Sequence, residues 1–428
     1  MPTTDYQTMW KDLGMNLEMH DNLCAALPMG IEATFQNEKN RPEAMGYWDM
    51  IIAQVHGLRP AELVEEKKKG RKVFGTFCVY VPDELIIAAN GIVTGLCGGS
   101  EFWVPSGEEV LPKNTCPLVK ASIGAHRSKT CPFFSLSDIY IGETTCDAKK
   151  KAYEILAEDS DVYVMDLPQM KREKDHVKWA GEIAEFAKVV ERVTGNKITP
   201  EKLKEAIKII NNRRKAMARV FDARKNPDNV PISGTDCLLM TQIAFFDDPE
   251  RCTQMCNKLA DELDARNKEG NSVAPNSYKR LMITGTPMAV PNWKVHSIIE
   301  HNLPAVVVCE EMCTGTRYVE NLVDESGETL EEMYRHLADR YLKNNCACFT
   351  PNKARVEDVI QKAKDYHVDG VIDCSLSFCN LYETEQYGIG RALKEAGIPC
   401  LSITTDYADS DSEQLKTRIG AFVEMLDN

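Results

Sequence analysis

The sequence predicts an α/β protein with two doubly wound parallel-sheet domains, an N-terminal helical segment and a helical insertion. The chain of 428 residues is too long for one ordinary core. In two regions, short and almost continuously apolar runs alternate with helical patterns, as expected for strands buried on both faces of a parallel sheet. A long amphipathic helical stretch lies between these regions.

The N-terminal helical segment is predicted at residues 1–70, where apolar side chains such as Trp10 and Leu13 recur at helical spacing. The first α/β domain follows at residues 71–174. It begins with an expected strand, KVFGTFCVYV, that contains Cys78, and a helix expected to open at Pro82 and close at Gly91. Three further strands are expected at GLCGGSEFWV (95–104), IYIGETT (139–145) and DVYVMDLP (161–168).

The helical insertion is predicted at residues 175–275 and the second α/β domain at residues 276–428. Cys252 and Cys256 share one face of a helix in the insertion and are interpreted as packing residues. In the second domain, cysteines lie near several strand-to-helix junctions, which is where ligands bind in open parallel sheets. The domain has no Walker or dinucleotide-binding motif.

Charge and targeting patterns narrow the classes of function. A net charge of −14 argues against nucleic acid as a partner. The N-terminus lacks the pattern of a signal peptide, and no apolar run has the length of a membrane span. We therefore expect a cytoplasmic protein with reduced thiols, in which 16 cysteines indicate metal, cluster or redox chemistry rather than disulfides.

Three cysteines, Cys116, Cys131 and Cys146, are spaced fifteen residues apart, and each is predicted to precede a helix. The first two are followed by proline, which suits the first helical position. The partial positive charge of a helix start stabilises a thiolate or an anionic cluster. A ligand role is favoured for Cys116 and Cys146, whereas a buried cysteine can also be a small hydrophobic residue. The chain has no C-x-x-C pair, so any cluster would need cysteines from distant segments.

Several motifs resemble the 2-hydroxyacyl-CoA dehydratase and benzoyl-CoA reductase superfamily from about Lys72 to the C-terminus. They are CPLVKASIG, GETTCDAKKKAYE, EEMCTGTRY, FCNLYETEQYG and TDYADSDSEQLKTRIGAFVEML. The resemblance implies two Rossmann-like domains whose cysteines hold an iron–sulfur cluster at their interface. Cys116, Cys146 and Cys379 match the positions typical of the superfamily.

The motifs FCVYVPDELIIAANG, CTGTR and NCACFTPN resemble the double-cubane cluster protein branch. That resemblance implies two 4Fe-4S cubanes bridged by sulfide into an 8Fe-9S cofactor, with three cysteines for each cubane. The second set of ligands would be Cys78, Cys313 and one of Cys346 and Cys348. Both are cofactor-binding candidates, and Cys348 is assigned to the set of iron ligands. Whether Cys131, Cys309 or Cys374 is a ligand stays open.

The function implied by this resemblance is a low-potential reductase that receives electrons from a separate ATP-dependent iron–sulfur activator. It would reduce small molecules such as acetylene and form a homodimer. One alternative is a 2-hydroxyacyl-CoA dehydratase subunit with a single 4Fe-4S cluster and a different partner subunit. A second alternative is a non-enzymatic metal-storage or electron-carrier protein.

Glu311 and Arg317 are the candidate catalytic residues because they flank Cys313. Arg317 would hydrogen-bond a cluster sulfide or an anion, and Glu311 would transfer protons. A surface ion pair and a solvated carboxylate are the corresponding alternatives.

Overall fold

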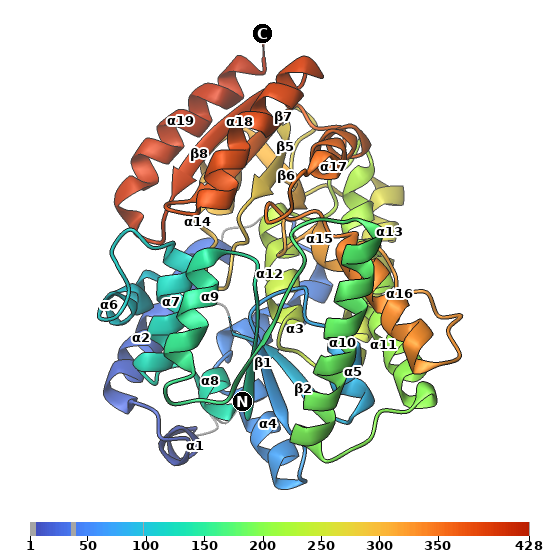
Figure 1. Cartoon of the computed structure of the whole chain (residues 1–428). Helices are drawn as coiled ribbons and strands as arrows, with labels where there is room; N and C mark the ends of the chain where they lie inside the picture. Colours follow the sequence, from blue (N-terminus) through green and yellow to red (C-terminus); the bar gives the residue numbers. More distant parts are fainter. Residues whose placement is uncertain (1–5, 36–39, 97, 428) are drawn as a thin grey trace.

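The computed structural model describes residues 6–35, 40–96 and 98–427. It contains two four-stranded sheets in which every pairing is parallel, with strand orders β2-β1-β3-β4 and β6-β5-β7-β8 (Figure 1). In each sheet the chain starts at an inner strand and continues to both sides, so the predicted α/β class with two doubly wound sheets is confirmed. The strands are β1 Val73–Thr76, β2 Ile92–Gly95, β3 Ile139–Glu143, β4 Val162–Met165, β5 Lys279–Gly285, β6 Ala305–Glu311, β7 Gly370–Leu376 and β8 Cys400–Thr405.

Both faces of the first sheet are covered by helices, because successive side chains of a strand point to opposite faces. Val73 and Tyr140 pack in the same core as Phe133 and Leu156 of α8 and α9. Their strand neighbours Phe74 and Ile141 instead pack in a core with side chains of α5, α10, α11 and α16. These helices are α5 Asp83–Ala88, α8 Pro132–Leu136, α9 Asp147–Leu156, α10 Glu173–Thr194, α11 Pro200–Asp222 and α16 Leu330–Leu342.

The N-terminal segment is helical as predicted and packs into the same core as α8 and α9. The second sheet is flanked by α14 and α19, which pack together, and by α17 and α18. The N-terminal helices are α1 Gln7–Asp12, α2 Leu17–Phe35, η1 Glu43–Met45, α3 Gly46–Ala53 and α4 Leu58–Lys68. The other helices are η2 Glu101–Trp103, α6 Val104–Glu108, α7 Pro117–Arg127, η3 Ala223–Lys225, α12 Gly234–Ala244, α13 Pro249–Glu269, α14 Lys294–Asn302, α15 Thr316–Val319, α17 Lys353–Asp365, α18 Asn380–Glu395, η4 Asp409–Asp411 and α19 Ser412–Met425.

Two helices connect the two sheets. Each of them packs beside the sheet to which its neighbours in the sequence do not belong. Helix α12 precedes the second sheet and packs against its strand β6. Helix α16 follows β6 but packs against α10, beside the first sheet. The predicted insertion is helical, and α11 and α13 pack along each other within it. The two sheets are therefore linked by shared helices as well as by the chain that joins them.

Two details of the first sheet differ from the sequence expectation. The apolar run at 72–81 forms a strand only as far as Thr76, and Cys78 lies in the bend that follows rather than inside the strand. The strand expected at 95–104 is wrong, because β2 ends at Gly95 and residues 101–108 form η2 and α6. Close packing explains the second difference, since a Cβ on Gly99 would lie only 1.9 Å from the carbonyl oxygen of Ala289.

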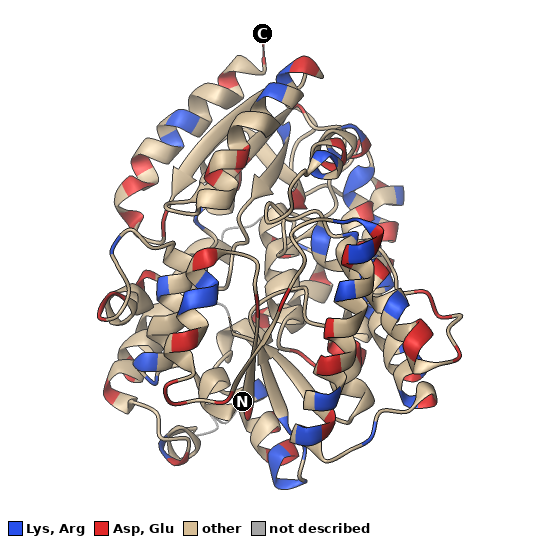
Figure 2. Ribbon diagram, viewed as in Figure 1, with Lys and Arg blue, Asp and Glu red and all other residues tan. Residues whose placement is uncertain are grey.

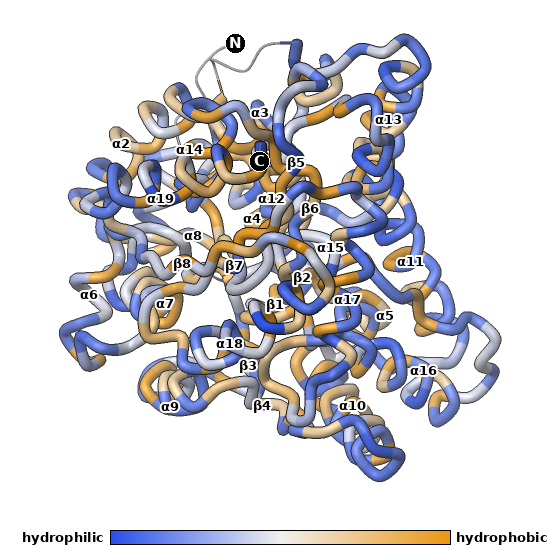
Figure 3. The backbone as a smooth tube through the Cα atoms, turned by 90° about the horizontal axis from the view of Figure 1, so that it is seen from above, coloured by the Kyte–Doolittle hydropathy of each residue, from blue (hydrophilic) through white to orange (hydrophobic). Residues whose placement is uncertain are grey.

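Charge and hydropathy follow the same layers. Lys, Arg, Asp and Glu are spread over the outer helices (Figure 2), while apolar segments gather toward the middle of the molecule (Figure 3). Every residue of β3, β6 and β7 is buried. Among the described residues, no helix combines the length and the hydropathy that crossing a membrane requires.

A glycine in α7 fixes the close approach of this helix to the segment before α6. A Cβ on Gly124 would lie 1.8 Å from the carbonyl oxygen of Trp103, so we expect Gly124→Ala to lower the thermal unfolding midpoint. Overpacking of this kind costs about 1–3 kcal/mol. Gly181→Ala in α10 is the matched control, because nothing lies within 4 Å of its Cβ position. It should stabilise the protein by about 0.5–1 kcal/mol. Equal shifts of the unfolding midpoint in the two variants, measured by calorimetry, would contradict this packing.

Candidate functional site

The carboxyl ends of both sheets border one cavity of about 240 Å³. Residues at or just after the ends of β1, β2, β5 and β7 line it, including Thr76, Gly95, Thr286 and Leu376. This is the position where open parallel sheets bind ligands. Six of the predicted site cysteines line the cavity: Cys78, Cys116, Cys146, Cys313, Cys346 and Cys379.

Three of these cysteines occupy the starts of helices. Cys116, Cys146 and Cys379 are the N-cap residues of α7, α9 and α18, and Cys131 has the same position in α8. The predicted helix starts after Cys116, Cys131 and Cys146 are therefore confirmed. Backbone N–H groups of the first turn donate to the sulfur atoms, from Leu118 and Val119 to Cys116 and from Tyr382 to Cys379. Such donors favour the thiolate over the thiol.

The three N-cap cysteines of the cavity are also electrostatic neighbours. A hydrogen bond with Cys379 lowers the pKa of Cys116, and the same contact raises the pKa of Cys379. Burial raises the pKa of Cys146, against the opposing charge of Lys149, and the charge of Cys379 raises it further. These three cysteines therefore form one group, which we call the first triplet.

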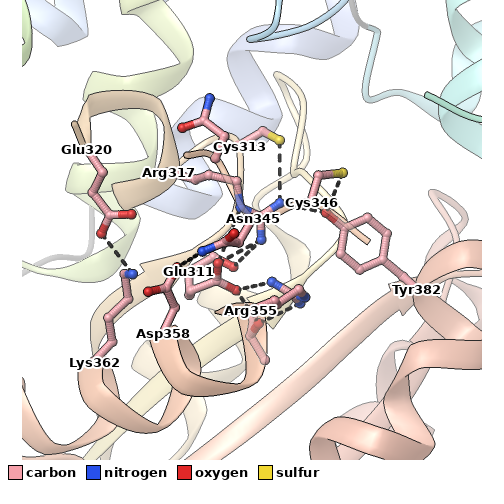
Figure 4. Close-up of polar contacts among 12 residues, drawn as sticks. Glu311, Cys313, Arg317, Glu320, Asn345, Cys346, Arg355, Asp358, Lys362 and Tyr382 are labelled. Atoms are coloured by element: carbon pink, nitrogen blue, oxygen red, sulfur yellow. Dashed lines mark hydrogen bonds and ion pairs between the residues drawn. The ribbon is translucent and has the colours of Figure 1, made fainter. Parts of the chain in front are cut away.

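The second triplet consists of Cys78, Cys313 and Cys346. Burial raises the pKa of Cys78 and Cys313, and the charge of Cys346 adds to both shifts. The Arg317 guanidinium donates to Cys313 Sγ at 3.7 Å and to the Tyr382 hydroxyl at 2.6 Å (Figure 4). That hydroxyl lies 3.6 Å from Cys346 Sγ.

Cys346 and Cys348 have different positions. Cys346 lines the cavity, whereas Cys348 is not among its lining residues. A hydrogen bond from Cys348 lowers the pKa of Cys346, as does the charge of Arg317, while the pKa of Cys348 is raised by the same contact. Of the other candidates, Cys131, Cys309 and Cys374 are buried and do not line the cavity either.

Glu311 and Arg317 form a buried ion pair behind the second triplet. Glu311 accepts from Arg317 at 2.8 Å and from Arg355 at 2.5 Å (Figure 4). It also accepts from Thr284 Oγ1 at 2.6 Å. Burial opposes ionisation of Glu311, but the charges of Arg317 and Arg355 outweigh it and lower its pKa to about 2. Neither Glu311 nor Arg317 is among the residues lining the cavity. Glu311 is thus arranged to hold two arginines rather than to donate a proton.

Three residues close to the two triplets were not singled out from the sequence. Tyr382 lies in the first turn of α18, three residues after Cys379. A helix that starts at Cys379 brings these two residues close together, so the sequence could have indicated this neighbour. Arg355 lies 44 residues from Glu311, and no local pattern connects them. Lys149 lines the cavity on the side of the first sheet, where it pairs with the buried Glu143 and donates to the carbonyl oxygen of Phe77 at 3.3 Å.

The donor set fits a thiophilic, anionic metal cluster. Six thiols border one cavity, and backbone N–H groups, Arg317 and Lys149 provide positive charge beside them. Thiolates are the ligands of iron–sulfur clusters, and hydrogen bonds to the sulfur atoms tune such clusters. A site of this composition can bind a cluster and exchange electrons through it.

The unequal acidity of two cysteines predicts unequal reactivity. Cys346 and Cys131 expose the same 8% of their surface, but burial raises the pKa of Cys131 to about 11 while that of Cys346 is lowered. Because the thiolate is the nucleophile, iodoacetamide at pH 7 should alkylate Cys346 at least about ten times faster in protein freed of metal. Peptide mass spectrometry over a time course measures both rates. Equal rates would contradict the described environment of Cys346.

Comparisons with known proteins identify the family of the chain. Residues 78–426 match the family described as 2-hydroxyglutaryl-CoA dehydratase, D-component. The chain is 37% identical to YjiM of Escherichia coli (strain K12), provisionally named a dehydratase subunit, over 85% of this chain and 94% of YjiM. It is 25% identical to the (R)-phenyllactyl-CoA dehydratase beta subunit of Clostridium sporogenes, over 85% of this chain and 97% of the relative.

It is also 23% identical to one of the benzoyl-CoA reductase subunits of Thauera aromatica, over 85% of this chain and 92% of that relative. The family match covers every strand except β1, which ends just before it, and all six cysteines of the cavity. The chain therefore belongs to the 2-hydroxyglutaryl-CoA dehydratase D-component family, whose relatives include subunits of both dehydratases and reductases.

Proposed function

We propose that this chain is the iron–sulfur component of a reductase that acts on small molecules. It would hold an 8Fe-9S double-cubane cofactor and receive low-potential electrons from a separate ATP-dependent iron–sulfur activator. The single observation that carries the proposal is the convergence of six cysteines from both halves of the chain on one cavity. When bound, the cofactor would supply electrons at low potential to a substrate in the same cavity.

The grouping of the cysteines supports two sites for cubanes. The first triplet, Cys116, Cys146 and Cys379, would hold one cubane with the help of the α7, α9 and α18 helix starts. The second triplet, Cys78, Cys313 and Cys346, would hold the other. We propose Cys346 rather than Cys348 as the ligand, since Cys346 lines the cavity and the charge of Arg317 favours its thiolate. Cys348 would then support Cys346 by a hydrogen bond.

The residues around the cavity have roles that follow from their contacts. Glu311, which is itself held by Arg355, keeps Arg317 in a fixed orientation, from which its guanidinium reaches both Cys313 and Tyr382. Arg317 is therefore a positioning residue that stabilises negative charge on the second triplet. Phe378 lines the cavity but is 49% exposed, so it marks where the cavity meets the surface. Because the cofactor would occupy part of the cavity of about 240 Å³, the space left favours a small substrate such as acetylene.

A dehydratase subunit with one 4Fe-4S cluster is the second candidate, and the names of several relatives favour it. That function needs the first triplet only. It gives no reason for three more cysteines to line the same cavity beside a buried arginine network. A non-enzymatic storage or carrier role is the third candidate. It is disfavoured by relatives named as subunits of dehydratases and of a reductase.

Two partners belong to this proposal. The first is the ATP-dependent activator, since no Walker motif is present in this chain to bind ATP. The second is another copy of the same chain in a homodimer. The alternative function would require a different subunit instead.

The cofactor content distinguishes the two enzymatic candidates. Anaerobically purified protein should contain about eight irons and about nine acid-labile sulfides per chain, against about four of each for a single cubane. Cys313→Ala should lower the iron content by about half or more, because the second triplet loses a ligand. Cys131→Ala is the matched control, since Cys131 is buried outside the cavity lining and its loss should leave the iron content unchanged. About four irons in wild type, unaffected by Cys313→Ala, would favour the dehydratase.

Activity provides an independent test. With an activator, ATP and a low-potential reductant, the protein should reduce acetylene, and omission of ATP should abolish the reaction. Arg317→Gln should reduce the rate by at least about tenfold, because a charge-assisted contact to the second triplet is lost. Ethylene measured by gas chromatography follows the reaction. Dehydration of a 2-hydroxyacyl-CoA ester, without acetylene reduction, would refute the proposal.

A further inference from the structure

A second cluster of metal-binding side chains lies in the N-terminal helical segment. His20 and Cys24 are on α2, and His56 lies in the turns between α3 and α4. Their potential ligand atoms all lie within 4.8 Å of one another. None of the three lines the cysteine cavity, and the family match begins only at residue 78. This cluster is therefore separate from the proposed cofactor site.

The three side chains come together through ordinary features of the fold. His20 and Cys24 are four residues apart, so α2 presents them on one face. The turns after α3 bring His56 Nδ1 to 2.9 Å from His20 Nε2. Cys24 Sγ lies 3.5 Å from that same nitrogen of His20. The sulfur atom also lies 3.7 Å from Nδ1 of His20, so it sits beside this ring close to the contact between the two histidines.

The surroundings hold this arrangement in place. Trp10 stands edge-on to His20, with 4.3 Å between the ring centroids. Its indole N–H donates to the carbonyl oxygen of His56 at 2.7 Å. His20 is fully buried. Burial lowers the pKa of both histidines, that of His56 to about 3.

We propose that His20, Cys24 and His56 bind a Zn²⁺ ion, with water or an exogenous ligand in the fourth position. Two imidazoles and one thiolate form a donor set that zinc prefers, and a tetrahedral zinc places such donors roughly 3.3–3.7 Å apart. The 3.5 Å contact between Cys24 and His20 has this spacing, and the 2.9 Å contact between the imidazoles needs only a small opening. On binding, the Cys24 thiol releases its proton to solvent.

Without a metal, a hydrogen bond between the histidines accounts for the first contact, and a contact of the Cys24 thiol with the His20 ring accounts for the second. A zinc ion uses all three donors. It would also clamp α2 to the α3–α4 connection, and thereby fix the N-terminal helices against α8, whose Phe133 lies against His56.

The test uses the cluster-loaded, full-length protein dialysed anaerobically against limiting Zn²⁺. We expect about one zinc per chain. Zinc-edge X-ray absorption should show two imidazole nitrogen atoms at about 2.0–2.1 Å from the zinc and one sulfur atom at about 2.3 Å. Cys24→Ser should remove the sulfur shell and weaken zinc binding at least about tenfold. His56→Gln should abolish stoichiometric binding. Zinc-edge spectra do not detect iron, so the cofactor does not interfere.

Cys400→Ser is the matched control, because Cys400 is also a partly buried free cysteine but lies on β8. It should retain zinc and its sulfur shell. The iron content, measured on every variant, should stay at the wild-type value. A normal iron content shows that the variant is folded, and it tests the proposed cofactor independently of zinc. If His56→Gln does not fold, the zinc content and sulfur shell of Cys24→Ser test the proposal instead. No stoichiometric zinc in wild type, or a sulfur shell that survives Cys24→Ser, would overturn the proposal.

Discussion

The crowding of six buried or half-buried thiols around one cavity is the constraint on which the rest of this site depends. Thiolates that share a buried space repel one another, and loss of water raises the pKa of Cys78, Cys146 and Cys313. The fold offsets this repulsion with positive charge beside each triplet. Helix starts donate N–H groups to the first triplet, and Arg317 donates to the second. An iron–sulfur cofactor would satisfy all six sulfur atoms at once.

The end of β6 shows how the strand alternation organises this charge. Glu310 and Glu311 are adjacent, so their side chains leave opposite faces of the sheet. Glu310 forms an ion pair with Arg224 at 2.7 Å, on the side of the helices that link the two sheets. Glu311 pairs with Arg317 and Arg355 on the side of the cavity. One adjacent pair of carboxylates thus anchors both the packing of the second sheet and the cation beside Cys313.

Much of this architecture could be predicted because it depends on local patterns. Apolar runs indicated the parallel strands, and the Cys-Pro pairs at Cys116 and Cys131 marked helix starts that the structure contains. The end of β1 could not be predicted in the same way, because the apolar run continues past Thr76 into a buried bend. There, burial comes from tertiary packing rather than from strand pairing.

The site itself could be predicted less completely than the fold, because it depends on contacts between distant segments. The resemblance pointed to these cysteines, but Cys346 and Cys348 are only two residues apart, and only the folded structure shows that Cys346 lines the cavity. Arg355 and the contact of His56 with α2 have no signal in the sequence, because 44 and 36 residues separate the partners. Such pairings depend on the complete fold.

The most direct test of the central claim is anomalous X-ray diffraction at the iron edge from anaerobically grown crystals. We predict two adjacent iron clusters in one cavity, one beside Cys116, Cys146 and Cys379 and the other beside Cys78, Cys313 and Cys346. Iron beside the first triplet alone, with the second triplet as free thiols, would contradict this prediction.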